Sequence, residues 1–171
     1  MTVMIEGLRL VDPLEVNRAD LFAFERTTWY EEAVNSGVSC GNAIRLFDGV
    51  TTDMHSQLMV ARGHDDETYF QVMQDDTDAI VALVDGDTAD NYLRKLYVVS
   101  GMQSRGLGSR LLEEYESRAA EGPIGLSVLR GNLRAQAFYS RHGYRIVDPK
   151  PRWIGRGIQA IDMVKERGVA A

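Results

Sequence analysis

Two glycines and two arginines lie close together in the segment QSRGLGSR, residues 103–110, at the expected start of an amphipathic helix. The first N–H groups of a helix have no carbonyl partner within it, and the helix dipole adds partial positive charge there. Gly106 and Gly108 keep side chains away from this backbone, while Arg105 and Arg110 add charge. The segment is therefore typical of a site for an anion, above all a phosphate.

Two common phosphate-binding loops do not match this segment. A Walker A loop needs Lys and then Ser or Thr directly after its second glycine, where Leu107 and Gly108 stand. A dinucleotide-binding loop needs a third glycine, where Leu111 stands, and lies near the first strand of its domain. A glycine pair before a helix also serves packing alone in many proteins, so the segment by itself leaves that interpretation open.

A third pattern, Q/R-x-x-G-x-G/A, is present as Gln103-Ser104-Arg105-Gly106-Leu107-Gly108 and resembles the pyrophosphate-binding loop of GNAT-type N-acetyltransferases. The run Leu96-Tyr97-Val98 before it resembles the end of that family's central strand. Asn132, Tyr139 and Gly143-Tyr144 after it resemble the family's second signature. The run 160–163 resembles its last strand. The resemblance covers residues 79–164 and is poor over the first 65.

This resemblance implies a mixed α/β (α+β) fold of the GNAT-like acyl-CoA acyltransferase type. The mixed central sheet is expected to splay at its fourth strand and to carry helices on both faces. We expect one domain over residues 1–171, with a variable acceptor-side part in 1–65 and an acetyl-CoA-binding core in 79–164.

The resemblance also implies that acetyl-CoA is the co-substrate. Backbone N–H groups of the loop would bind its diphosphate, and the backbone of Leu96 and Val98 would bind the pantetheine arm and the acetyl carbonyl, with the Val98 N–H group as oxyanion donor. Asn132 suits an N-cap as well as a coenzyme contact. The expected coenzyme-binding residues are Leu96, Tyr97, Val98, Gln103, Ser104, Arg105, Gly106, Leu107, Gly108, Ser109, Asn132 and Tyr139.

Tyr139 is the expected general acid. Acetyl transfer from the coenzyme releases a thiolate, whose conjugate acid has a pKa near 8.5 if it behaves like cysteine. A tyrosine with a pKa near 10 stays protonated at neutral pH and can supply that proton.

The general base is not determined by the sequence. The two central-strand positions where the family commonly carries a carboxylate or histidine hold Tyr92 and Arg94, neither of which is a good base at neutral pH. Glu25, Glu31 and Glu32 are candidates that would act through water, and the alternative is that no single base exists.

The segment Trp29-Tyr30-Glu31-Glu32 is the expected acceptor site, because aromatic faces and carboxylates suit a cationic amine. A Trp/Tyr core face with a solvated acidic flank explains the same residues. His55 and His64 have no standard metal-ligand spacing, so we expect solvated loop residues and no metal site.

The composition indicates one globular domain with a core, since 44% of the 171 residues are hydrophobic. The net charge is −6, with 25 acidic and 19 basic residues, which argues against a broad basic nucleic-acid interface and weakly favours cationic partners. The lone Cys40 is expected to be buried. The longest apolar run, 79–84, is too short for a membrane helix, so we expect a cytoplasmic location and no membrane partner. A homodimer is left open.

Periodicity and turn residues predict the elements that position these side chains. Strands are expected at 4–11, 69–73, 79–84, 92–99, 124–129, 144–147 and 160–164, with turns at 75–76 and 85–87 and a Pro/Trp-containing loop before the last strand. Helices are expected at 16–35, 41–62 with a break near 48–49, 106–120 and 132–141.

The function favoured by these observations is N-acetyl transfer from acetyl-CoA to a primary amine, of a small cationic molecule or a peptide, by direct attack in a ternary complex. The alternative is a non-catalytic acetyl-CoA-binding sensor or regulatory module. The absence of a strand carboxylate favours the sensor, and Tyr139 argues against it. A third interpretation is an unrelated α+β domain whose glycine loop only packs.

Overall fold

The structure, a computed structural model, describes residues 7–45, 49–50, 52–155 and 157–168. Within these ranges the strands form one mixed sheet in the order β1-β2-β3-β4-β5-β8-β6, with β7 paired to β8. The strands are β1 (Leu8–Val11), β2 (Thr68–Asp75), β3 (Ile80–Asp87), β4 (Tyr92–Val98), β5 (Ile124–Leu129), β6 (Arg145–Ile146), β7 (Arg152–Gly155) and β8 (Ile158–Lys165). The helices are α1 (Arg18–Asn35), α2 (Cys40–Arg45), α3 (Thr52–Gly63), the 3-10 turn η1 (Ser100–Met102), α4 (Leu107–Glu116) and α5 (Leu133–Arg141).

The sheet divides into two parts where β4 meets β5. Strands β1 to β4 form an antiparallel meander, whereas β4 and β5 are parallel and pair only through Tyr92 with Gly125 and Leu93 with Leu126. Beyond Leu93 the two strands are no longer paired. The mixed sheet that opens at its fourth strand is thus confirmed.

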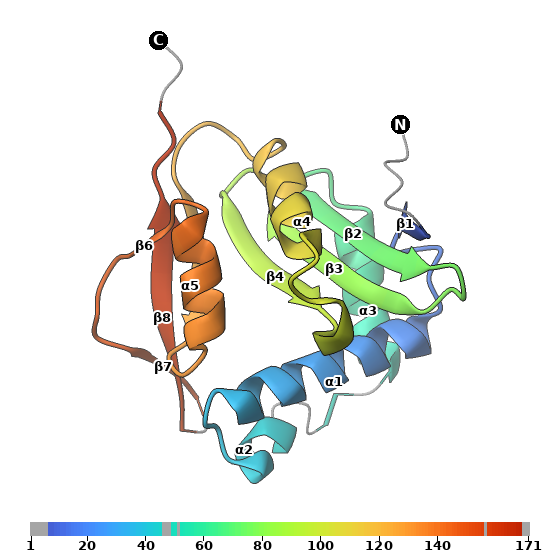
Figure 1. The fold of residues 1–171 in the computed structure, drawn as a ribbon. Helices are drawn as coiled ribbons and strands as arrows, with labels where there is room; N and C mark the ends of the chain where they lie inside the picture. The colour runs from blue at the N-terminus through green and yellow to red at the C-terminus, as the bar shows by residue number, and fades with distance from the viewer. Residues whose placement is uncertain (1–6, 46–48, 51, 156, 169–171) are drawn as a thin grey trace.

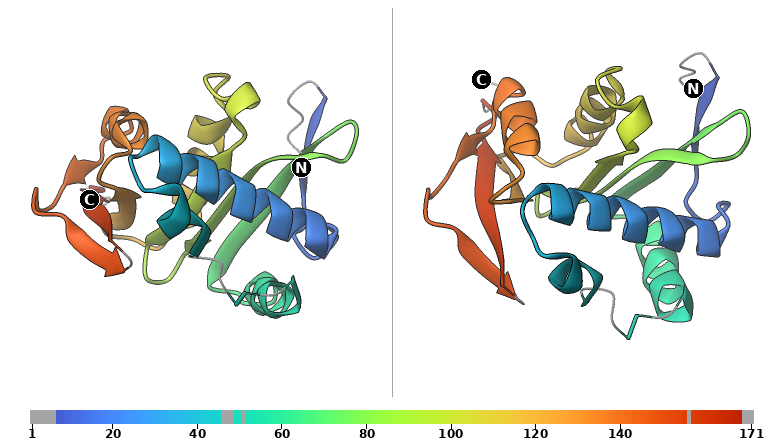
Figure 2. Two further views of the ribbon diagram at one scale, coloured as in Figure 1. Left: turned by 90° about the horizontal axis from the view of Figure 1, so that it is seen from below. Right: turned by 60° about the horizontal axis from the view of Figure 1, so that its bottom comes forward.

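Helices cover both faces of the sheet, as expected (Figure 1). The α4 and α5 helices lie on one face, while α1 and α3 lie on the other, and the two views of Figure 2 agree on this arrangement. Under α4 the core contains Leu111, Leu112 and Tyr115, all fully buried. A second core on the α1 and α3 face includes Leu21 and Leu83. Each such buried side chain contributes roughly 1.5–3 kcal/mol, so apolar burial holds both helix layers to the sheet.

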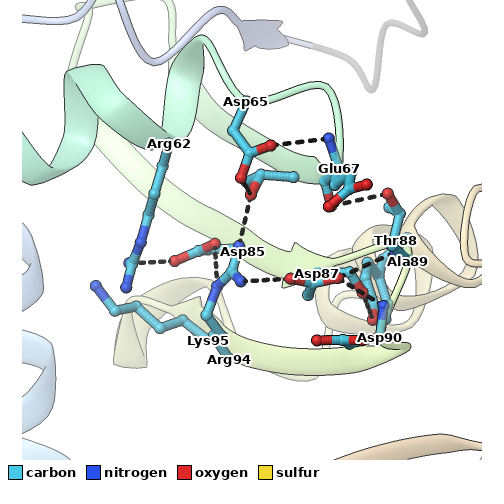
Figure 3. A network of polar contacts seen from close by, with 12 residues as sticks. Arg62, Asp65, Glu67, Asp85, Asp87, Thr88, Ala89, Asp90, Arg94 and Lys95 are labelled. Carbon is cyan, nitrogen blue, oxygen red and sulfur yellow. Dashed lines mark hydrogen bonds and ion pairs between the residues drawn. The ribbon is translucent and has the colours of Figure 1, made fainter.

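The turn predicted at residues 85–87 is wrong, because these residues continue β3. The Asp85 carboxylate is completely buried and lies between two guanidinium groups, 2.5 Å from Arg62 of α3 and 3.0 Å from Arg94 of β4 (Figure 3). A buried carboxylate is tolerated when it is paired in this way. The residues usually typical of a turn are therefore retained inside the strand by charge pairing.

Smaller differences concern other segments. The predicted Pro/Trp loop contains β7, which pairs with β8. The helix predicted to reach residue 120 ends at Glu116, and the Ala120 N–H group donates to the Thr88 carbonyl instead. Cys40, expected to be buried, is exposed at the start of α2. Residues 4–6 of the first predicted strand and residue 48 of the predicted helix break lie outside the described ranges.

Across the described ranges, every helix falls short of the length and apolar character that crossing a bilayer requires.

Gly86 gives a test of this packing. A Cβ atom added there would overlap the ring of Tyr115, whose hydroxyl group donates to the Asp87 carbonyl over 2.7 Å. Gly86→Ala should lower the free energy of unfolding by about 1–3 kcal/mol in urea titrations, because the core is overpacked. The matched control is Gly41→Ala in α2, where an added Cβ meets no atom within 4 Å. Equal stabilities of the two variants would contradict this account.

Candidate active site

The glycine loop presents backbone N–H groups at the start of α4. Gly106 is the N-cap residue, has a φ of 81° and receives no side-chain cap. The first hydrogen bond of the helix runs from the Arg110 N–H group to the Gly106 carbonyl over 3.0 Å. The N–H groups of the three preceding residues, 107–109, therefore have no carbonyl partner within the helix. This is the geometry of an anion site, and the positive φ explains the glycine at 106.

Gly108 has a packing role as well. A Cβ atom added there would lie 3.4 Å from the Phe138 ring of α5 and 3.9 Å from Val98 of β4. The missing side chain thus lets α4 approach α5 and the central strand closely. The packing interpretation and the anion-site interpretation hold together for this residue.

The backbone of β4 faces the opening in the sheet at the positions predicted. The Val99 N–H group donates to the Val81 carbonyl of β3 over 2.9 Å. Because backbone groups alternate in direction along an antiparallel pair, those of Leu96 and Val98 point away from β3, toward the side on which β5 has parted. The Gln103 side chain donates to the Val98 carbonyl over 2.8 Å, which ties the loop to the strand.

Asn132 caps α5 and also contacts α1. Its Oδ1 atom accepts from the Ala135 N–H group over 2.9 Å, and its Nδ2 atom donates to Oε1 of Glu32 over 2.8 Å. The N-cap role is therefore present in the structure. The coenzyme contact stays a prediction, for which one amide hydrogen is available.

Tyr139 lies on α5 and belongs to the core cluster that includes Leu126 and Val128 of β5. Its side chain is only 8% exposed, with ring contacts to Phe138 and Tyr144. Within the described residues its hydroxyl group makes no hydrogen bond. Burial, assisted by the negative charge of Glu32, raises the pKa of Tyr139 well above that of an ordinary tyrosine. The phenol therefore keeps its proton at neutral pH, as a general acid must.

Glu32 is the carboxylate closest to this tyrosine in electrostatic terms. Burial raises its pKa, and the hydrogen bond from Asn132 partly offsets that rise. Burial, with Glu32 as the next cause, also raises the pKa of Tyr97 on β4, and Tyr139 contributes to the same shift. One carboxylate and two phenols from three different elements thus lie within electrostatic range of one another.

The α1 helix is attached to both sides of this opening. On one side Glu25 forms an ion pair with Lys95 of β4. On the other, a Cβ atom at Gly131 would overlap the Ser36 carbonyl oxygen, so the end of α1 touches the β5–α5 connection directly. Figure 1 shows α1 running from the side of β3 and β4 toward α5. Glu32 lies on α1 between these two attachment points.

Glu25, another of the three candidate bases, is engaged within the fold by His55 and Lys95. Burial would raise its pKa, but hydrogen bonds and charge from His55 and Lys95 outweigh burial and lower it. His55 lies 3.3 Å from the Glu25 carboxylate and is buried, so the expectation of a solvated His55 is wrong. His64 is exposed, as expected. No sequence signal indicated Lys95 or His55, because their roles come from contacts between distant elements.

The predicted acceptor segment is divided between two environments. Trp29 and Tyr30 pack against a small core that includes Leu129 and Ile158, and Glu31 is exposed. Glu32 instead accepts a hydrogen bond from Asn132, the N-cap residue of α5. The seven-residue spacing between Glu25 and Glu32, two helical turns, was the available signal that both face the sheet.

Comparison with known proteins gives a consistent result. The family model "Acetyltransferase (GNAT) domain" matches residues 35–167. Blasticidin-S acetyltransferase of Streptomyces morookaense is 41% identical over 73 residues, 42% of this chain and 53% of that protein. The uncharacterized N-acetyltransferase YjcF of Bacillus subtilis is 30% identical over 74 residues, 43% of this chain and 52% of that protein. The matched part therefore spans about half the length of these relatives.

Solved structures resemble almost the whole chain. PaiA N-acetyltransferase from Thermoplasma acidophilum in complex with coenzyme A has a TM-score of 0.69 at 17% identity and covers 94% of this chain and 99% of that one. Spermidine N-acetyltransferase from Vibrio cholerae, in complex with CoA and spermine, has a TM-score of 0.62 at 17% identity, with 95% and 96% coverage. At these identities the likeness concerns the fold.

The raised pKa of Glu32 predicts a stability cost at neutral pH. The folded state binds this proton more readily than the unfolded chain does, so ionisation favours unfolding as the pH rises, and the cost vanishes where both states are protonated, below about pH 4. Glu32→Gln keeps an acceptor for Asn132 and should be at least as stable as the parent at pH 7.5. The advantage should shrink as the pH falls toward about 4.

Urea titrations across this pH range provide the measurement. Glu31→Gln, on the exposed neighbouring residue, is the control and should change stability little at any pH. A marked loss of stability in Glu32→Gln at neutral pH would instead make the carboxylate a structural partner.

Proposed function

This chain belongs to the GNAT acetyltransferase family, whose co-substrate is acetyl-CoA, and from this we propose that it transfers the acetyl group of acetyl-CoA to a primary amine of a small cationic molecule. The observation that carries the proposal is that Glu32 of α1 and Tyr139 of α5 lie within electrostatic range of Tyr97, which is on the part of β4 that β5 no longer pairs. A peptide amine is the second acceptor class that this chemistry admits.

The residues around the glycine loop fit the coenzyme. Uncapped N–H groups at residues 107–109 suit the diphosphate, and the backbone of Leu96 and Val98 suits the amide groups of the pantetheine arm. When bound, the coenzyme supplies an acetyl thioester. The Val98 N–H group would bind the acetyl oxygen as negative charge develops on it.

Glu32 is proposed to receive the acceptor. One carboxylate oxygen accepts from Asn132, and within the described residues the other makes no hydrogen bond, so it is available to an ammonium group. An ammonium ion cannot attack until it loses a proton. A carboxylate with a raised pKa can take that proton, directly or through water. The neighbouring phenols favour a cation through their oxygen atoms and ring faces.

Tyr139 is proposed to protonate the leaving sulfur atom. Its buried phenol keeps the proton at neutral pH, and its electrostatic influence on Tyr97 of β4 supports this role. Attack by the amine and departure of the thiol then proceed directly in a ternary complex, without an acyl-enzyme. Cys40, the one cysteine of the chain, lies exposed on α2.

The named relatives support a small-molecule acceptor. One of them is a blasticidin-S acetyltransferase, which by its name acts on an antibiotic. The acidic balance of the chain, with a net charge of −6, also favours cationic acceptors over anionic ones.

A screen of amines tests the proposal. Protein and acetyl-CoA are incubated with polyamines, aminoglycosides, nucleoside antibiotics and basic peptides, and products are detected by the mass of an added acetyl group together with free thiol. We expect acetylation of at least one small cationic amine. Coenzyme binding without turnover on any acceptor would instead support the sensor alternative.

Tyr139→Phe tests the acid. The variant keeps the buried ring but has no proton to donate, so turnover should fall by about a hundredfold or more while the KM for acetyl-CoA changes little. Tyr144→Phe is the matched control, because Tyr144 packs on the Tyr139 ring but directs its hydroxyl group to Glu116 over 2.9 Å. Unchanged turnover in Tyr139→Phe would remove this residue from the mechanism.

A further inference from the structure

His142, at the end of α5, joins that helix to the first turn of α4. Its Nδ1 atom lies 2.8 Å from the Phe138 carbonyl oxygen, and its Nε2 atom lies 3.0 Å from Oγ of Ser109. The ring also packs on Phe138, with 4.4 Å between ring centroids. These contacts hold the imidazole in one orientation beside the glycine loop.

The two hydrogen bonds determine where the protons lie. A carbonyl oxygen only accepts, so Nδ1 of His142 carries a hydrogen. In the neutral ring Nε2 is then an acceptor, and the Ser109 hydroxyl group must donate to it. In the protonated ring Nε2 donates to Ser109, and the hydroxyl hydrogen is released to point elsewhere.

This choice matters because of where Ser109 lies. Its own N–H group is one of those without a helix partner at the start of α4. A diphosphate bound there has only acceptor oxygens. Beside the neutral ring, Ser109 offers it lone pairs, whereas beside the protonated ring Ser109 offers it a hydrogen, and the ring adds a positive charge.

We propose that His142 is a positioning residue for the coenzyme diphosphate, and that diphosphate binding draws a proton from solvent onto His142, which turns the Ser109 hydroxyl group toward the anion. This inference rests on the proposed function, since it requires the coenzyme at the glycine loop. It adds a residue that the loop motif does not contain.

Charged residues of both signs lie on the elements around His142. The charged residues on the elements around His142 are Arg105, Arg110, Glu113, Glu114 and Glu116 on the loop and α4, Arg134 and Arg141 on α5, Arg145 on β6, and Asp162 and Lys165 on β8. Glu116 is bound by Tyr144 and Lys165. Within the described residues, His142 belongs to no ion pair, so a bound anion is the change that would favour its charged form.

Calorimetry tests the inference. Binding of 3′-dephospho-coenzyme A is measured at pH 7 in two buffers of different ionisation enthalpy, which gives the number of protons taken up. This probe lacks the phosphate monoester that itself titrates near neutral pH. The wild type should take up a fraction of a proton, and His142→Phe, which keeps the ring contact with Phe138, should take up none.

Ser109→Ala keeps the imidazole and removes the hydroxyl group, so proton uptake should fall there as well. Each variant should bind the probe about tenfold more weakly, the effect of one lost charge-assisted hydrogen bond, and the double variant should lose no more than either. In His142→Phe the KM for S-acetylpantetheine, which has no diphosphate, should not change. A merely structural role of His142 would raise it.

The outcomes separate the two proposals. Equal proton uptake by wild type and His142→Phe, or additive losses in the double variant, would overturn the role of His142 alone. Failure of the wild type to bind the probe would overturn the proposed function and this inference together. If His142→Phe does not fold, Ser109→Ala alone decides, because retained proton uptake in it contradicts the inference.

Discussion

The structure depends on the loss of hydrogen bonding between β4 and β5 after Leu93. Two parallel strands that stayed paired would satisfy each other's backbone and leave no polar edge inside the sheet. Their separation removes strand partners from the backbone of Leu96 and Val98, at a cost of up to about 1–3 kcal/mol for each group left without a partner, and the Gln103 side chain replaces the partner of the Val98 carbonyl. Packing of α4 and α5 on one face and of α1 on the other offsets this loss, because it holds the two parts of the sheet in place.

Residues far apart in sequence share one electrostatic environment near this opening. Glu32 comes from α1, Tyr97 from β4 and Tyr139 from α5, and none of these elements is adjacent to another along the chain. Burial at one place raises the pKa of all three, which separates a carboxylate able to accept a proton from phenols that retain theirs. The proposed assignment of base and acid follows from this shared environment.

The local structure around the expected coenzyme site was predictable from sequence, because it depends on neighbouring residues. The loop at 103–108, the strand before it and the helix capped by Asn132 carry their signals in neighbouring residues. The acceptor side was not, because it depends on contacts between elements. Asp85 was predicted to lie in a turn, yet it is buried and paired with Arg62 and Arg94. His55 was predicted to be solvated, yet it is buried beside Glu25. The spacing of residues along the chain does not indicate which side chains of distant elements will pair.

The contact between Gly131 and the Ser36 carbonyl has a further consequence. It leaves no room for any side chain at 131, so α1 rests on the second half of the sheet at a fixed height, while the Glu25–Lys95 pair secures it to the first half. The regular rise of the helix fixes the axial distance between Glu25 and Glu32 at about 10 Å. Adaptation to a bulkier acceptor would therefore require substitutions of side chains on α1, because the helix is attached at both ends and cannot shift.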